Sequence, residues 1–150
     1  MGQSLAQVYI HLVFGTKNRE PSLDDGLRDG LHSYIGGILQ KLDSPVLAIN
    51  SMADHVHLLF RLSRTTTLAK AEEDTKKVSS RWIKSRPGQS ARFAWQVGYG
   101  AFSVSASMVP AVTAYIEHQP EHHRQRTFKE ELQMLFDRHG VVYDERYLWG

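Results

Sequence analysis

The sequence contains no cysteine among its 150 residues. Disulfides, thiolate zinc sites, iron-sulfur clusters and cysteine nucleophiles are therefore excluded, and any bound metal must be held by nitrogen and oxygen ligands. The absence of cysteine is compatible with a reducing compartment, and we expect the protein to act in the cytoplasm.

Long apolar runs are missing as well. No stretch approaches the roughly 18 residues that a membrane-spanning helix requires, and the start Met1-Gly2-Gln3-Ser4 lacks the basic and then apolar pattern of a secretory signal. We therefore expect a soluble protein with no membrane partner. With 41% hydrophobic residues the chain can bury one core, and neither a linker nor a repeat divides it. A single domain over residues 1–150 is expected.

Net charge is also small, at +2, and indicates no particular partner. The placement of the charges is more informative, because residues 75–92 contain basic residues and no acidic one. The basic residues are Lys76, Lys77, Arg81, Lys84, Arg86 and Arg92. Trp82 lies within this run, and Phe93 and Trp95 follow it. Such a stretch suits phosphate neutralisation and base stacking on single-stranded or hairpin DNA, although a solvated helix face with Trp82 in the core is the alternative.

Four segments have the features of β-strands. Residues 6–15 alternate between strongly apolar and other side chains, which is the period of a strand with one buried face. Residues 46–52 and 55–62 are extended segments joined by a short polar link, as in a hairpin, and residues 101–107 form the fourth segment.

Helical spacing separates these strands. Apolar residues recur every three or four positions over residues 22–42 and again over residues 67–86. A third helix is predicted over residues 108–119, with Pro110 tolerated in its first turn and Pro120 forcing it to end near Gln119.

A last helix begins at a capping box. Thr127 and Glu130 have the required spacing, and the helix is predicted to run to about Arg138. The order strand, helix, strand, strand, helix, strand predicts an α+β, ferredoxin-like sandwich, with an antiparallel sheet, helices on one face and extra C-terminal helices. A fold of this kind hosts many functions, so function must be argued from the site.

The first candidate for chemistry is a histidine pair. His55 and His57 are two residues apart in a predicted strand, so both side chains leave the same face and can converge on one ion. Packing of one or both rings is the alternative. His11 lies opposite the apolar stripe of its strand, and we interpret it as a structural or supporting residue.

The second candidate is on the third predicted helix. Tyr115 and Gln119 are four residues apart, so a phenol and a carboxamide project from one helix face. An amphipathic helix whose tyrosine covers the core is the alternative. His118, His122 and His123 suggest a zinc cluster, but Pro120 interrupts the helix between them, and a surface or supporting role is favoured.

These residues together resemble the single-tyrosine HUH transposases of bacterial and archaeal insertion sequences and the related REP-associated tyrosine transposases. The resemblance spans nearly the whole chain. Its marks are residues 9–14 (YIHLVF) with 16–19 (TKNR), 54–59 (DHVHLL), 95–103 (WQVGYGAFS) and 115–123 (YIEHQPEHH).

The resemblance implies a function and a set of roles. Family members act as homodimers on single-stranded DNA with hairpin ends, and cut and rejoin it through a covalent 5′-phosphotyrosine intermediate. By motif, Tyr115 is the nucleophile, and His55, His57 and Gln119 are ligands of Mg²⁺ or Mn²⁺, although imidazoles alone suit zinc too. It also favours Arg81, Lys84 and Arg86 as DNA contacts. In relatives the tyrosine helix can complete the partner's site, so action in cis or in trans is left open.

Three other functions were weighed. A metal-dependent phosphodiesterase would use water while Tyr115 only packs; its histidine-triad version is excluded because Leu59 stands where a third histidine is required. A non-catalytic nucleic-acid-binding module would stack bases on Tyr9 and Phe102. A domesticated, non-mobile relative would keep the same site.

Overall fold

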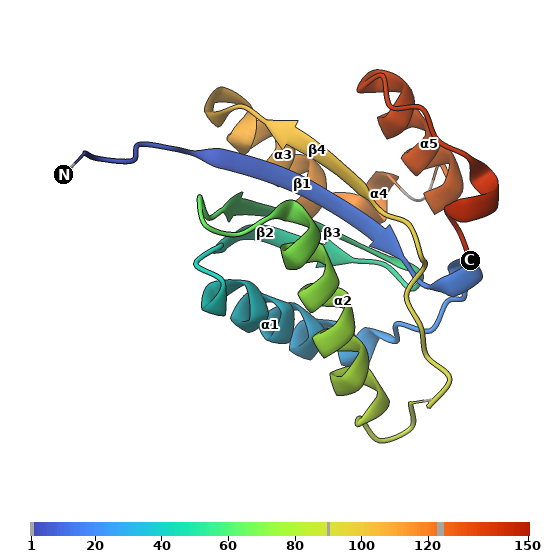
Figure 1. Cartoon of the computed structure of the whole chain (residues 1–150). Helices are drawn as coiled ribbons and strands as arrows, with labels where there is room; N and C mark the ends of the chain where they lie inside the picture. Colours follow the sequence, from blue (N-terminus) through green and yellow to red (C-terminus); the bar gives the residue numbers. More distant parts are fainter. Residues whose placement is uncertain (1, 90, 123–124) are drawn as a thin grey trace.

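A computed structural model describes residues 2–89, 91–122 and 125–150 of the chain (Figure 1). The strands are β1 (Val8–Gly15), β2 (Val46–Ser51), β3 (His55–Leu62) and β4 (Gly100–Val104). The helices are α1 (Asp25–Lys41), α2 (Leu68–Lys84), α3 (Val109–Glu117), α4 (Gln119–His122) and α5 (Phe128–Arg138), with short 3-10 turns at Lys17–Arg19, Ala106–Met108 and Glu145–Tyr147.

The four strands form one antiparallel sheet in the order β2-β3-β1-β4. With α1 between β1 and β2, and α2 between β3 and β4, this is the predicted ferredoxin-like topology. The two central strands, β1 and β3, pair along their full lengths, from Val8 opposite Leu62 to Gly15 opposite His55. The histidine pair therefore lies at the end of a central strand, where neighbouring strands and helices restrict its position.

One face of the sheet carries the main core. Alternate residues of β1 and β3, among them Leu12 and Leu58, are fully buried against the apolar stripes of α1 and α2. The period of two along a strand places the residues between them, His11 and His57, on the opposite face. The site is therefore separated from α1 and α2 by the thickness of the sheet.

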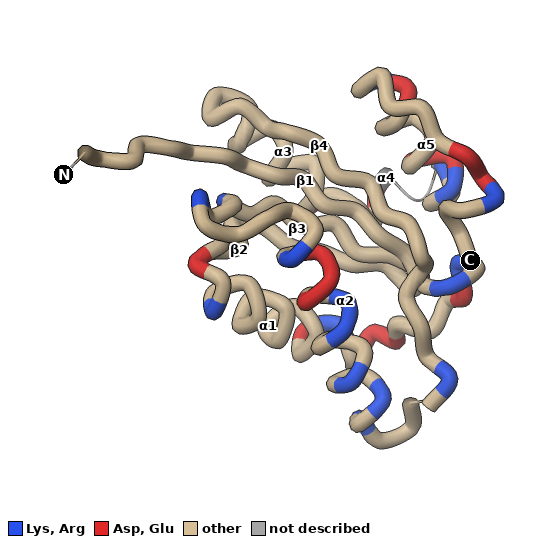
Figure 2. The backbone as a smooth tube through the Cα atoms, in the orientation of Figure 1, with Lys and Arg blue, Asp and Glu red and all other residues tan. Residues whose placement is uncertain are grey.

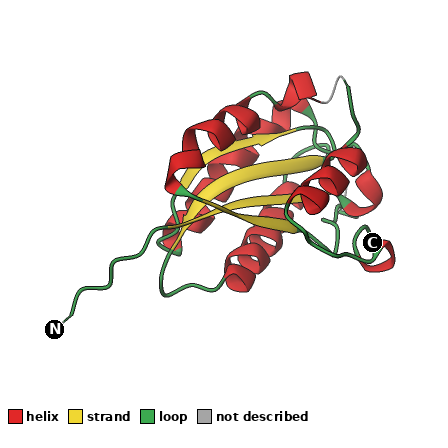
Figure 3. Ribbon diagram, turned by 90° about the horizontal axis from the view of Figure 1, so that it is seen from above, coloured by secondary structure: helices red, strands yellow, loops and turns green. Residues whose placement is uncertain are grey.

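The opposite face is covered by the C-terminal helices, and Figure 3, seen from above, shows helices on both sides of the sheet. Helix α3 packs through Ile116 against Ala48 and Leu59, and α5 packs through Phe128, Leu132 and neighbouring residues in a second apolar cluster. Helices therefore lie on both faces of the sheet, with the extra C-terminal helices supplying the second layer.

The predicted elements agree with the structure apart from their ends. Both halves of the capping box between Thr127 and Glu130 form, and α5 ends at Arg138 as predicted. The prediction of a fourth strand over residues 101–107 is wrong beyond Val104, where the observed strand ends. The chain turns there into a 3-10 segment, in which the Met108 amide donates to the Ser105 carbonyl. Of the described helices, none is both long and apolar enough to cross a bilayer.

Candidate active site

Two strands of the sheet carry three histidines that face α3 and α5. His11 on β1 is 4% exposed, whereas His55 and His57 on β3 are fully buried. The ring centroids of His11 and His57 lie 5.1 Å apart, and those of His55 and His57 lie 5.2 Å apart. The i, i+2 spacing thus brings His55 and His57 onto one face, as the sequence predicts.

His55 is oriented by the residue before it. Its Nδ1 donates to Oδ1 of Asp54 over 2.6 Å, which leaves Nε2 as the ring nitrogen that can serve as a metal ligand. The ring also stacks on Phe128 of α5, with centroids 4.2 Å apart and an interplanar angle of 6°. Nε2 faces inward, 3.4 Å from Oε1 of Gln119 and 3.5 Å from Oε1 of Glu131. A carboxylate partner behind a ligating imidazole is a recurrent arrangement in metal sites.

His57 is positioned by His11. Nδ1 of His57 and Nε2 of His11 lie 2.9 Å apart. Burial, and then the neighbouring His57, lower the pKa of His11 to about 3, so His11 is a neutral partner. This contact agrees with the interpretation of His11 as a supporting residue, because it engages Nδ1 of His57 and leaves Nε2 directed at the site.

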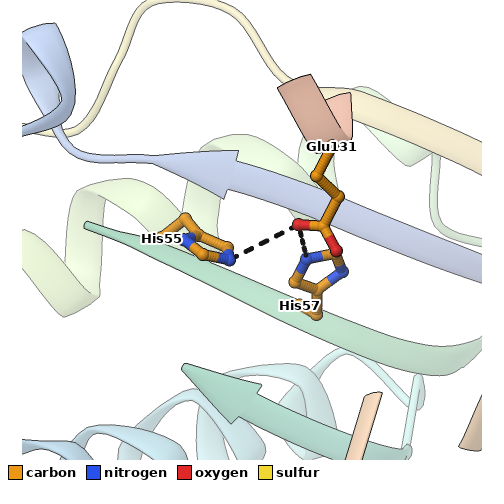
Figure 4. Close-up of side chains that lie close together, drawn as sticks. All are labelled: His55, His57 and Glu131. Carbon is orange, nitrogen blue, oxygen red and sulfur yellow. Dashed lines mark hydrogen bonds and ion pairs between the residues drawn. The ribbon is translucent and has the colours of Figure 1, made fainter. Parts of the chain in front are cut away.

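Glu131 completes the cluster and was missed by the sequence analysis. It extends from α5 over the end of β3, as Figure 4 shows, and it is fully buried. Its Oε1 lies 2.9 Å from Nε2 of His57. A signal was present in the sequence: Glu131 occupies the apolar stripe of its helix beside Phe128, Leu132 and Leu135, where a carboxylate needs a buried partner.

Tyr115 reaches the same carboxylate from α3. Its hydroxyl donates to Oε2 of Glu131, and its ring lies 5.9 Å from that of His57, centroid to centroid. Burial, reinforced by the adjacent Glu131 carboxylate, raises the pKa of Tyr115, so the phenol is protonated here. The asparagine Asn50 of β2 holds this end of α3, because its amide donates to the carbonyls of Ile116 and Glu117 over 3.1 and 3.2 Å.

Gln119 lies beyond the end of α3. Helix α3 stops at Glu117, two residues earlier than predicted, and after His118 the residue Gln119 begins the short helix α4, with Pro120 in its first turn. Gln119 is nevertheless fully buried, with its side-chain oxygen 3.4 Å from Nε2 of His55. The structure therefore brings together all four residues predicted for the site.

The donor set fits a divalent cation. The ligand atoms of His55, His57 and Glu131 lie within 4.8 Å of one another, and all three residues are buried. Two imidazoles and a carboxylate are a common facial set for divalent first-row metals. The sequence analysis predicted a ligand set with no charge, and the carboxylate of Glu131 changes this to a set that offers one negative charge.

The predicted DNA-contacting residues lie elsewhere. Arg81, Lys84 and Arg86 are exposed on the second half of α2 and just after it, and Figure 2 shows that Lys and Arg gather there. Helix α2 packs on the sheet face opposite the histidines, so these cations do not adjoin Tyr115. Lys76 of the same run is half-buried and bound to Glu72 and to the carbonyls of Gln96 and Gly98.

Most of the aromatic residues proposed for stacking are in the core. Phe93 and Trp95 are buried against Phe14, and Phe102 is 3% exposed, which corrects the expectation that they offer ring faces to bases. Trp82 is half-buried and stacks on Tyr34 of α1. Among the other histidines, His118 is exposed and binds the Ala114 carbonyl, while the side chain of His122 and all of His123 lie outside the described residues.

Comparisons with known proteins agree with this architecture. A family model described as IS200-like transposase matches residues 4–119. The structure resembles a crystal structure assigned as a transposase from Deinococcus radiodurans R1, with 25% identity, a TM-score of 0.62, and coverage of 79% of this chain and 96% of that one. It also resembles a REP-associated tyrosine transposase bound to a REP hairpin, with 14% identity, a TM-score of 0.59, and coverage of 82% of this chain and 74% of that one.

The fold and the matched segment define the class of protein as a transposase with a ferredoxin-like sheet. The chain belongs to the IS200-like transposase family. No curated protein matches its sequence. The family segment ends at residue 119, so that it contains Tyr115 and the histidine pair, whereas Glu131 lies beyond it.

Proposed function

We propose that this protein cleaves and rejoins single-stranded DNA at hairpin ends of an insertion sequence or REP element, with Tyr115 as the nucleophile. One observation carries the proposal: within a single chain, the Tyr115 hydroxyl and the His57 imidazole bind the two oxygens of the same carboxylate, that of Glu131. A phenolic oxygen and a candidate metal centre are therefore close enough to act on one phosphate. The arrangement favours action in cis, in which Tyr115 works with the metal ligands of its own chain.

His55, His57 and Glu131 would hold a divalent cation, with Gln119 as a further oxygen donor beside His55. We propose Mg²⁺ or Mn²⁺, because oxygen ligands suit hard cations and the reaction requires no redox change. When bound, such an ion polarises the scissile phosphate and stabilises the negative charge that develops on it. Asp54 and His11 then act as positioning residues, because each binds the far nitrogen of a ligating ring.

The chemistry of Tyr115 is a transesterification. The Tyr115 hydroxyl gives up its proton as its oxygen attacks the phosphorus, and the bond from phosphorus to the 3′-oxygen breaks. The leaving 3′-oxygen takes up a proton, so the products are a 5′-phosphotyrosine and a free 3′-hydroxyl. The number of phosphodiester bonds is unchanged, so no nucleotide cofactor is needed. Since phenol has a pKa of about 10, it remains an adequate leaving group when a DNA 3′-hydroxyl later attacks the intermediate.

We propose a separate role for the cations at the end of α2 and just after it. Arg81, Lys84 and Arg86 lie on the face away from Tyr115, so we propose that they contact the hairpin stem rather than the cleaved strand. We also propose that the protein acts as a homodimer. Because the cluster forms within one chain, we propose that each protomer of the dimer carries a site of its own.

The experiment is a covalent capture. Labelled single strands that carry candidate hairpin ends are incubated with protein and Mn²⁺ and resolved on a denaturing gel. We expect a protein-DNA adduct with the wild type and none with Tyr115→Phe. Tyr147→Phe is the matched control, because Tyr147 is 70% exposed and far from the cluster.

The alternative function has its own signature. A phosphodiesterase that uses water would release DNA fragments without an adduct, and Tyr115→Phe would cleave at close to the wild-type rate. An adduct that persists in Tyr115→Phe would also overturn the assignment of the nucleophile.

A further inference from the structure

A groove adjoins Tyr115 on the side of α3 that faces β4 and α5. It has a volume of about 550 Å³, and Tyr115 and His11 form part of its lining. A second hollow, of about 460 Å³, lies beside Asp54 and the start of α5, and its lining does not include Tyr115. Among these two, the first groove is the one that reaches the nucleophile.

The groove has apolar walls. Val112 and Ala111 line it from α3, and Met108 adds a thioether side chain that is 51% exposed. Flat nucleobases pack well on such surfaces, because stacking and apolar contact do not depend on base identity. A volume of this size lies in the range of small-molecule pockets, and it suits one or two splayed nucleotides better than a paired stem.

One rim of the groove carries a cation. Arg138, the last residue of α5, is exposed and lines the groove, and no hydrogen bond or ion pair of its side chain is found among the described residues. An arginine with this exposure binds a phosphate without first breaking an ion pair. The apolar wall and the cationic rim match the two parts of a nucleotide.

The candidate metal ligands are covered by the described part of the chain. His55, His57, Gln119 and Glu131 are fully buried, and the apolar cluster around Phe128 and Leu132 holds α5 against the sheet. Removal of α5 would expose this cluster to water, so its displacement is unfavourable. A phosphate that meets Tyr115 therefore enters along the groove.

We infer that the groove between β4, α3 and α5 binds the single strand next to the cleaved bond, with bases on the Met108 and Val112 wall and a phosphate on Arg138. This inference rests on the proposed function and adds the location of the scissile strand. It assigns Arg138 and the groove to the strand that is cut, and leaves the cations of α2 to the hairpin.

The test measures binding and does not require cleavage. A fluorescein-labelled, random-sequence single strand of about 12 nucleotides, a length within single-strand site sizes, is titrated by anisotropy against Tyr115→Phe protein, with Mn²⁺ and again with EDTA. Two alanines of α3 give a matched pair: both are exposed, but only Ala111 lines the groove. We expect Ala111→Trp to weaken binding by at least about tenfold, and Ala114→Trp to leave it within about twofold.

Arg138 supplies the second pair. Arg138→Ala should weaken binding several-fold and reduce the slope of log K against log salt by about 0.7, the value for one phosphate contact on a single strand. Arg64→Ala is the control, because Arg64 is exposed and does not line the groove. Wild-type affinity in both Ala111→Trp and Arg138→Ala would overturn the inference. If these variants lose binding but the wild type forms no adduct, the groove assignment stands and the proposed chemistry fails.

Discussion

Tyr115 and His57 are joined through a single carboxylate, because each binds one oxygen of Glu131. The two residues come from different elements, a helix and a central strand, and a third element connects them. The proposed nucleophile is consequently held at a fixed position relative to the candidate metal ligands before any substrate arrives. Side chains that are already positioned in this way need to move less to reach the geometry in which the reaction occurs.

Removing the charge of Glu131 should weaken metal binding. Glu131→Gln keeps the shape of the side chain but lowers the negative charge offered to a cation, so we expect Mn²⁺ affinity to fall by at least about tenfold. Isothermal titration calorimetry measures this directly. Glu117→Gln is the control, because Glu117 is exposed at the end of α3. Unchanged affinity in Glu131→Gln would remove Glu131 from the ligand set.

Asp54 should act through His55. Asp54→Ala removes the acceptor that holds Nδ1 of His55, so that the ring can rotate and change tautomer. We expect Mn²⁺ affinity to fall about 10–100-fold. Asp137→Ala, an exposed site on α5, should bind like the wild type. Wild-type Mn²⁺ affinity in Asp54→Ala would show that His55 does not need Asp54 to orient it.

Two glycines should respond in opposite directions to a methyl group. In Gly15→Ala the new Cβ would meet the ring of Phe128 and the Asp54 carbonyl at the edge of the site, and we expect a loss of about 1–3 kcal/mol. In Gly37→Ala, within α1, the Cβ meets nothing within 4 Å, and the higher helix propensity of alanine should add about 0.5–1 kcal/mol. Urea unfolding measures both. A stabilised Gly15→Ala would show that the edge of the site is loosely packed.

Stability should depend on pH through His32. Burial lowers the pKa of this side chain, whose ring is bound to the Ser51 hydroxyl, below the ordinary value of 6.5. Below pH 6.5 the unfolded chain takes up a proton that the folded chain resists, so the free energy of unfolding falls as the pH decreases. Between roughly pH 7.5 and pH 5, His32→Gln should therefore lose less stability than the wild type. The exposed His118→Gln should behave like the wild type, and an equal loss in all three proteins would contradict the prediction.

The fold follows closely from the sequence where a local pattern determines it. The alternation in β1, the hairpin pattern that includes β3 and the capping box of α5 were sufficient to locate those elements. The fourth strand was predicted too long because its serines and small residues alternate as a strand does, while a turn at Ser105 ends the pairing. Such an end depends on tertiary contacts, which periodicity does not report.

The site was predicted less completely, for a physical reason. His55 and His57 follow from the period of a strand, and their meeting with Tyr115 follows from family motifs. Glu131 is far from them in sequence and belongs to no motif used above, so its position became visible only when α5 was placed on the sheet. The groove and the position of Arg138 depend on the same packing, so they could not be predicted from the sequence either.

Glu131 lies on a helix separate from that of Tyr115, and this separation has a consequence for the chemistry of the centre. Substitutions in α5 can alter the charge of the centre, and with it the preferred ion, while the segment that bears the nucleophile stays intact. In this protein the choice of ion can therefore be changed from α5 alone, without a change in the central strands or in the helix of Tyr115.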